Sequence, residues 1–273
     1  MNDLPLPGQP GWNAFDPSSS SFFETLRRTA PDAVPGAFRG EVPSGFAASV
    51  PEGTTVLALV YAGGVIIAGD RRATAGNLIS KKDMRKVFPA DRYSAIAISG
   101  VAGPAMELAK VFALELEHYE KVEGEHLSLE GKANKLALML RANLPLAMQG
   151  LIVVPLFAGV DLRTGDGRIF EYDPTGGRYL ARDYAATGSG SMTARGVLKR
   201  EHDPTNDLST AVRLAVDALF DAAEEDSATG GPDLVRRIYP IVAVIDRDGY
   251  DELTDDTVRE HVEAVVDRRR ARA

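Results

Sequence analysis

The 273-residue sequence contains no cysteine. Disulfide bonds, thiolate zinc sites and a cysteine nucleophile are therefore all excluded. Long hydrophobic runs are also missing, because no stretch approaches the ~18 to 20 apolar residues of a membrane span. The start of the chain, Met1 to Trp12, lacks the basic segment and following apolar run of a secretory signal. From these absences we expect a soluble, cytoplasmic protein with no membrane contact.

Positive charge is in the minority, with 31 Lys and Arg against 39 Asp and Glu, a formal net charge of -8. A nucleic-acid surface needs a concentrated positive field, so we expect no nucleic-acid partner. The chain also lacks the Gly-x-Ser-x-Gly, His-Glu-x-x-His, phosphate-loop and dinucleotide motifs. We therefore expect no cofactor and no catalytic metal. Four histidines lie among polar residues, as is typical of solvated surface positions: His118, His126, His202 and His261.

The first 53 residues differ in texture from the rest of the chain. They contain several Pro and Gly, a run of four serines at 18–21, and one short helix-like patch near residues 22–28. At Thr54 the pattern changes to apolar and β-branched runs, which indicates that a folded domain starts there. We interpret residues 1–53 as an appendage. The alternative is a disordered tail whose end at residue 53 has no functional meaning.

The spacing of apolar residues predicts strands, two helices, strands, two helices and a last strand. Predicted strands cover residues 54–61, 65–68, 93–99, 152–161, 168–173, 184–187 and 238–245. Predicted helices follow Gly103-Pro104, cover 129–149, begin near 189, run through 208–219, and cover 257–270. Paired helices between groups of antiparallel-looking strands favour an α+β fold, a four-layer αββα sandwich, over a doubly wound parallel sheet.

The junction Gly53-Thr54-Thr55 is the candidate nucleophile site. A threonine hydroxyl needs a base, and a free α-amino group on the same residue, with a pKa of ~7.7 to 8.0, could serve. That amine exists only if the bond between Gly53 and Thr54 is cut. Gly53 lacks Cβ, so it can adopt the strained conformation that an N-to-O acyl shift demands. The simpler interpretation, two β-forming threonines after a glycine turn, stays open.

Asp70 and Lys86 lie next to apolar strands, where partial desolvation of their charges is expected. Asp70 directly follows the apolar run of residues 65–69, and Lys86 ends the basic run of residues 81–86. Each has a structural alternative: Asp70 could cap a strand, and Lys86 could belong to a solvated loop. The residues alone leave both interpretations open.

Six short segments follow one another along the chain: GTTV at 53–56, AGDRRAT at 68–74, KV at 86–87, ISG at 98–100, ATGSGS at 186–191 and DSATGG at 226–231. In this order they resemble segments of the β subunits of proteasomes, in particular the actinobacterial ones, which are N-terminal nucleophile hydrolases. The resemblance covers residues 53 to about 246. It implies the αββα fold and the activity of a threonine endopeptidase.

The resemblance also implies a role for each matching residue. Thr54 would be the nucleophile, its freed amine the base, and Lys86 the cation that lowers the effective pKa of the hydroxyl. Asp70 would orient Lys86, while Ser189 and Asp226 would hold the Thr54 amine through hydrogen bonds.

Further matching positions concern the substrate. Thr229 stands where the family often has serine and keeps the hydroxyl. The Gly100 N–H would be an oxyanion donor, and backbone groups near Thr74 and Gly100 would bind an extended substrate as an added strand. An apolar pocket would favour hydrophobic residues before the cut; its lining would be Ala73, Met84, Ile98, Ala102 and Met106.

The resemblance implies that residues 1–53 are a propeptide removed by autocatalytic cleavage between Gly53 and Thr54, leaving a catalytic domain of residues 54–273. Seven-membered rings of β copies would stack on each other, with α-type subunits in flanking rings and an ATPase ring or other activator feeding unfolded proteins. Two alternatives remain: a non-catalytic ring subunit, and an amidase of the asparaginase type. The simpler bacterial heat-shock protease of the same fold begins almost at its threonine, unlike this chain.

Overall fold

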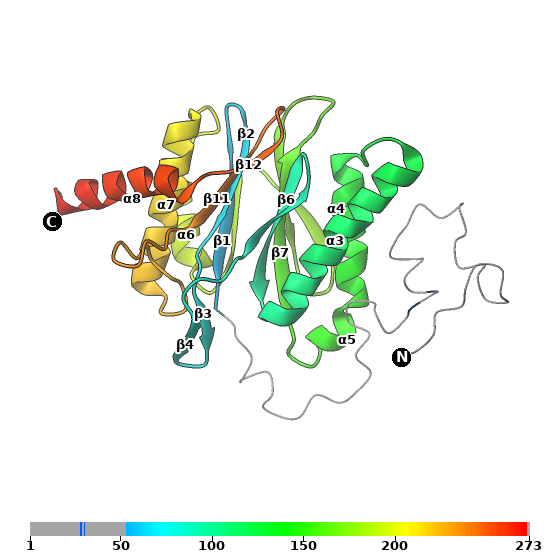
Figure 1. Ribbon diagram of the computed structural model, residues 1–273, viewed down its shortest axis with the longest axis horizontal. Coiled ribbons are helices and arrows are strands. Elements are labelled where there is room, and N and C mark those ends of the chain that lie inside the picture. Colours follow the sequence, from blue (N-terminus) through cyan, green and yellow to red (C-terminus); the bar gives the residue numbers. More distant parts are fainter. Residues whose placement is uncertain (1–27, 29, 31–52, 272–273) are drawn as a thin grey trace.

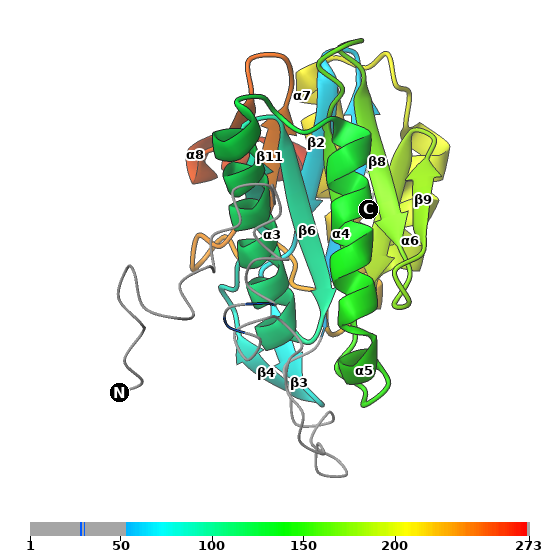
Figure 2. The same cartoon turned by 90° about the vertical axis from the view of Figure 1, so that its right-hand side faces the viewer.

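The computed structural model describes residue 28, residue 30 and residues 53–271. The predicted appendage, residues 1–53, therefore lies outside the described residues except at 28, 30 and 53. In the described part of the chain, two five-stranded antiparallel sheets pack face to face, with helices on the outer face of each (Figure 1). The turned view shows helices α3 (Ala102–Glu123) and α4 (Leu129–Ala142) over one sheet (Figure 2). The predicted four-layer αββα sandwich is confirmed.

The first sheet joins distant parts of the chain in the order β10-β1-β2-β11-β12. Its strands are β1 (Thr55–Tyr61), β2 (Gly64–Gly69), β10 (Tyr184–Gly188), β11 (Ile241–Ile245) and β12 (Tyr250–Glu252). The second sheet has the order β5-β6-β7-β8-β9. Its strands are β5 (Val87–Asp91), β6 (Ser94–Gly100), β7 (Val153–Val160), β8 (Gly167–Tyr172) and β9 (Arg178–Ala181).

A separate hairpin, β3 (Ala73–Ala75) and β4 (Leu78–Lys81), lies at the end of the sandwich where β1 begins (Figure 1).

The central strands are buried on both faces. Side chains alternate along β1, so Val56 and Ala58 pack against the second sheet while Leu57 and Leu59 pack toward the helices. A strand covered on both sides needs apolar residues at every position, which explains the uninterrupted apolar runs that marked β1 and β2 in the sequence. The start of β1 is thereby fixed between the second sheet and the helices that cover the first.

Helices form the two outer layers. α6 (Ser191–Glu201), α7 (Leu208–Glu225) and α8 (Asp255–Arg270) cover the first sheet. Val212, Val216 and Leu219 of α7 are buried against it, at the spacing that the sequence predicted. α3 and α4 cover the second sheet with a matching apolar face. Each sheet therefore has its own helical layer, and the two sheets share the core between them.

Element boundaries differ from the predictions where proline intervenes. The helix predicted over 129–149 ends at Ala142, and a four-residue helix, α5 (Leu144–Ala147), follows, because Pro145 lacks an N–H and clashes with a preceding turn. The last strand begins at Ile241 rather than residue 238, since Pro240 cannot donate to the ladder. The strands β3, β4, β5, β9 and β12 were not predicted.

Candidate active site

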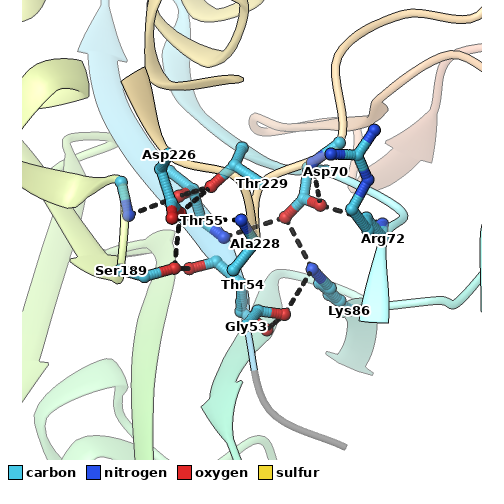
Figure 3. Close-up of polar contacts among 12 residues, drawn as sticks. Gly53, Thr54, Thr55, Asp70, Arg72, Lys86, Ser189, Asp226, Ala228 and Thr229 are labelled. Carbon is cyan, nitrogen blue, oxygen red and sulfur yellow. Dashed lines mark hydrogen bonds and ion pairs between the residues drawn. The ribbon is translucent and has the colours of Figure 1, made fainter. Parts of the chain in front are cut away.

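Asp70 and Lys86 form a buried ion pair beside the start of β1 (Figure 3). Lys86 Nζ donates to Asp70 Oδ1 at 2.6 Å, and both side chains are 0% exposed. Asp70 follows β2 of the first sheet, and Lys86 precedes β5 of the second. The pair therefore bridges the two sheets, and the two predicted residues are in contact.

The Asp70 carboxylate is held by the backbone as well as by Lys86. Oδ1 accepts from the N–H of Thr55 at 2.8 Å, and Oδ2 accepts from the N–H groups of Arg72 and Gly230, each at 2.8 Å. Burial lowers the pKa of Lys86, and the attraction of Asp70 opposes that shift only in part. The site thus combines a fixed carboxylate with an ammonium that is easier to deprotonate than an exposed lysine.

The carbonyl oxygen of Gly53 receives two hydrogen bonds (Figure 3). Thr54 Oγ1 donates to it at 2.6 Å and Lys86 Nζ donates at 3.2 Å. A hydroxyl and an ammonium therefore both contact the carbonyl group of the peptide bond between residues 53 and 54. This is the bond at which cleavage is predicted from the sequence.

Glycine is required at residue 53 by its surroundings. Its φ is 96°, and a Cβ there would lie 2.4 Å from Thr74 Oγ1 and 2.7 Å from Ala228 Cβ. A side chain would therefore be strained and would collide with both neighbours. The same closeness places Thr74, a predicted substrate-binding residue, beside the bond.

Ser189, Asp226 and Thr229 form a second polar group on the other side of Thr54 (Figure 3). Asp226 Oδ2 accepts from Ser189 Oγ and from Thr229 Oγ1, each at 2.5 Å. The N–H of Ser189 donates to the Thr54 carbonyl at 2.9 Å. Because residue 54 is still joined to Gly53, its nitrogen is an amide, and Ser189 contacts its carbonyl. That Ser189 and Asp226 hold the free amine of Thr54 after cleavage therefore stays a prediction.

Thr55 is a site residue that the sequence interpretation missed. Besides its N–H bond to Asp70, its Oγ1 lies 2.6 Å from Thr229 Oγ1 and accepts from the N–H of Gly190 at 3.0 Å. The sequence held one indication of this role. Thr55 directly follows the candidate nucleophile, and because side chains alternate along a strand, its side chain points to the opposite face from that of Val56. Its partners, however, depend on the register of β1 with β10.

The remaining predicted residues lie on other elements. Gly100 ends β6 with a φ of 100°, and its N–H stays a predicted oxyanion donor. Ala73 opens β3, and Ile98 is buried on β6 beneath α3. Of the other predicted pocket residues, Ala102 and Met106 lie at the start of α3, and Met84 precedes β5. The pocket stays a prediction.

A cavity of about 160 Å³ is lined in part by Arg72 and Gly230, whose backbone N–H groups donate to Asp70. Three arginines line it, and two of them already pair with carboxylates: Arg71 with Asp83 at 2.5 Å, and Arg236 with Asp233 at 2.8 Å. Arg72 donates its guanidinium N–H to a backbone carbonyl at 3.0 Å. The cavity is thus part of the scaffold around the Asp70 turn.

The histidines take no part in these contacts. All four are half-buried rather than solvated, which corrects the sequence interpretation. His202 Nε2 lies 2.8 Å from the carbonyl oxygen of Val60, near the end of β1 away from Thr54. Burial lowers the pKa of His261, which lies on α8. His126 and His202 make edge-to-face ring contacts with Tyr93 and Tyr184, respectively.

The described residues contain neither a candidate metal site nor a membrane-spanning helix. Across residues 53–271 and the two isolated positions before them, no group of three His, Cys, Asp or Glu side chains could hold a metal ion. Nor does this part of the chain contain a helix long and apolar enough to cross a membrane.

Comparisons with known proteins agree with the resemblance seen in the sequence. The model of the proteasome subunit family matches residues 50–235, more than half of the chain. A protein named proteasome subunit beta from Acidothermus cellulolyticus is 55% identical over 260 residues, which cover 93% of this chain and 89% of that protein. Proteins of the same name from Streptomyces griseus and Acidimicrobium ferrooxidans are each 54% identical, over 93% and 90% of this chain and 90% of each relative. With the αββα fold and these identities, the chain belongs to the proteasome subunit family.

Proposed function

We propose that this chain is a catalytic β subunit of a 20S proteasome and a threonine-type endopeptidase with Thr54 as its nucleophile. One observation carries the proposal: the Thr54 hydroxyl and the Lys86 ammonium both donate to the carbonyl oxygen of Gly53. A nucleophile and a cation placed on one carbonyl are the groups that acyl transfer needs. The names of the relatives support the same assignment.

The first reaction is cleavage of the chain itself. Thr54 Oγ1 bonds to the carbonyl carbon of Gly53, and charge develops on the oxygen to which Lys86 donates. The bond to the Thr54 nitrogen then breaks, the nitrogen takes the hydroxyl proton, and an ester remains. Water hydrolyses the ester, leaving a carboxylate on Gly53 and a free amine on Thr54. Residues 1–53 are the propeptide in this scheme, and residues 54–273 the mature catalytic domain.

The free amine completes the mature site. It accepts the proton of its own hydroxyl, while Lys86, oriented by Asp70, stabilises the developing alkoxide. Ser189 and Asp226, with the hydroxyl of Thr229, hold the amine in place. The Gly100 N–H receives the negative charge that forms on the substrate carbonyl.

Substrate binding uses the edge of the site. An extended peptide lies between the backbone of Thr74 and that of Gly100, so affinity is largely independent of sequence. The pocket formed by Ala73, Met84, Ile98, Ala102 and Met106 selects hydrophobic residues before the cut. A panel of fluorogenic peptides tests the selection; a preference for acidic or basic residues would overturn it.

In the assembled particle, we propose that the subunit forms seven-membered rings with other β copies. Two such rings stack and are flanked by rings of α-type subunits in the cytoplasm. An ATPase ring or other activator then feeds unfolded proteins into the closed chamber.

The deciding experiment is the intact mass of the β chain after co-expression with its α-type partner. Wild-type chain is expected to begin at Thr54, the Thr54→Ala chain to keep its leader, and Thr54→Ser, which retains a hydroxyl, to be cut. If wild type and Thr54→Ala both keep the leader, the non-catalytic ring subunit becomes the better assignment. Equal trimming of both would assign the cut to another protease.

A further inference from the structure

We propose that Thr55 is a positioning residue for the reaction: its buried hydroxyl fixes the Asp226 carboxylate and the Ser189 hydroxyl against Thr54. The inference rests on the proposed function, because it assigns a role in the cleavage that Thr54 carries out. Thr55 is 0% exposed and follows the nucleophile directly, at the first position of β1.

The direction of the hydrogen bonds follows from counting protons. Each hydroxyl has one proton to donate, and an ionised carboxylate only accepts. Thr229 Oγ1 donates to Asp226 Oδ2 at 2.5 Å, so in its 2.6 Å contact with Thr55 Oγ1 it must be the acceptor. Thr55 in turn accepts from the N–H of Gly190 at 3.0 Å. The bonds therefore run in one direction, from Gly190 through Thr55 and Thr229 to Asp226.

Ser189 reaches the same carboxylate from the other side. Its Oγ lies 2.5 Å from Asp226 Oδ2 and 3.3 Å from the carbonyl oxygen of Thr54. The single proton of Ser189 goes to the closer acceptor, Asp226. The position of the carboxylate therefore fixes the direction in which the lone pairs of Ser189 Oγ point. An aligned chain of this kind also strengthens each bond by polarisation.

Thr55 is also the residue that joins the two halves of the site. Its backbone N–H donates to Asp70, the partner of Lys86, and its side chain leads through Thr229 to Asp226. One residue therefore sets the distance between the ammonium and the second carboxylate, on either side of residue 54.

A purely local role does not explain this hydroxyl. A buried threonine in a strand can satisfy its hydroxyl with a nearby carbonyl, but the partners of Thr55 are 135 and 174 positions away in the chain. They belong to the turn before α6 and to the loop after α7. The contact thus ties both loops to the strand that carries the nucleophile.

The charge on Asp226 is sensitive to this arrangement. Burial raises its pKa, but hydrogen bonds from Ser189, Thr229 and the Ala228 N–H outweigh burial, so the pKa is lowered overall. The charged group that faces Asp226 from the second sheet is Lys86, and it acts in the same direction. Without the Thr55 hydroxyl, the Thr229 hydroxyl loses its donor and is a weaker donor itself.

The test is Thr55→Val in particles co-expressed with the α-type partner, with Thr55→Ser as the conservative variant. Valine keeps the shape and removes the hydroxyl. We expect kcat to fall roughly tenfold with little change in KM, the loss typical of one missing hydrogen bond in a positioned group. The acid limb of kcat/KM should move to higher pH, because the pKa of Asp226 rises. Thr55→Ser should restore both.

A matched control is Ser94→Ala. Ser94 is the first residue of β6, the strand that Gly100 ends. Ser94 Oγ is also buried and donates to a carboxylate, Asp91, at 2.6 Å. The control is expected to lose stability while keeping the wild-type pH profile. If Thr55→Val keeps that profile too, or if Thr55→Ser fails to restore it, the inference falls. Failure of the proposed function looks different, because wild-type particles would then keep the leader, or Thr54→Ala particles would be cleaved as well.

Discussion

Replacing Gly53 with alanine should slow cleavage of the chain. The carbonyl of Gly53 meets Thr54 Oγ1 and Lys86 Nζ only while residue 53 has a φ of 96°. Alanine would relax toward negative φ and carry the carbonyl oxygen away from both donors. The reactive conformation would then be a minor one in the uncut chain.

Two costs of Gly53→Ala set the expected size of the effect. A left-handed conformation costs a residue with Cβ roughly 1–2 kcal/mol, which alone corresponds to about 5- to 30-fold in rate. The new Cβ would also lie 2.4 Å from Thr74 Oγ1 and 2.7 Å from Ala228 Cβ. Overpacking of this kind adds about 1–3 kcal/mol, so cleavage should be at least about thirtyfold slower.

The assay is the intact mass of Gly53→Ala chain over time after assembly with the α-type partner. Gly76→Ala is the matched control, since Gly76 also has a positive φ, 55°, but a Cβ there meets nothing within 4 Å. The control should be processed at about the wild-type rate. Processing of Gly53→Ala as fast as the control would refute the argument that this backbone conformation positions the carbonyl.

Two further predictions concern stability, measured by urea unfolding of the purified chain. Asp70→Asn should lower the free energy of unfolding by about 3–5 kcal/mol, because it leaves the Lys86 ammonium buried without its anion. Lys86→Met should lower the free energy of unfolding by less, since three backbone N–H groups still donate to the Asp70 carboxylate. A larger loss for Lys86→Met than for Asp70→Asn would contradict this account. Leu219→Ala, at a 0% exposed position, should lower the free energy of unfolding by about 2–5 kcal/mol. Leu208→Ala on the same helix, where the side chain is 40% exposed, should lower it by only about 0.5 kcal/mol. Equal losses for the two variants would count against the packing of α7.

Much of the fold could be predicted because its central strands are buried on both faces. Burial on both sides produces uninterrupted apolar runs such as those of β1 and β2, and these were identified. The β3–β4 hairpin was missed because β4 is exposed at every position, which leaves no apolar pattern to detect. Proline positions moved two boundaries, at Ala142 and Ile241, where hydrophobic spacing alone continues the element.

The candidate site, like the fold, could be predicted from the sequence only in part. Partial desolvation was expected for Asp70 and Lys86, but the residues alone also left a strand cap open for Asp70 and a solvated loop open for Lys86. The part played by Thr55 could not be predicted, because its side-chain partners come from loops at residues 190 and 229. Which loops meet there depends on the pairing of β10 with β1, a register that the sequence pattern does not specify.

The buried position of Lys86 explains how one lysine can take part in both proposed cleavages. Its Nζ donates to the Gly53 carbonyl in the uncut chain, where it would stabilise the charge that forms in the proposed self-cleavage. Removing Gly53 takes away that acceptor but leaves the bond to Asp70, so the ammonium stays beside the hydroxyl of Thr54. Because desolvation lowers its pKa while Asp70 favours its charge, the group can also exchange a proton more readily than a surface lysine. The packing of one sheet on the other, which creates this burial, is thus a direct requirement of the proposed chemistry.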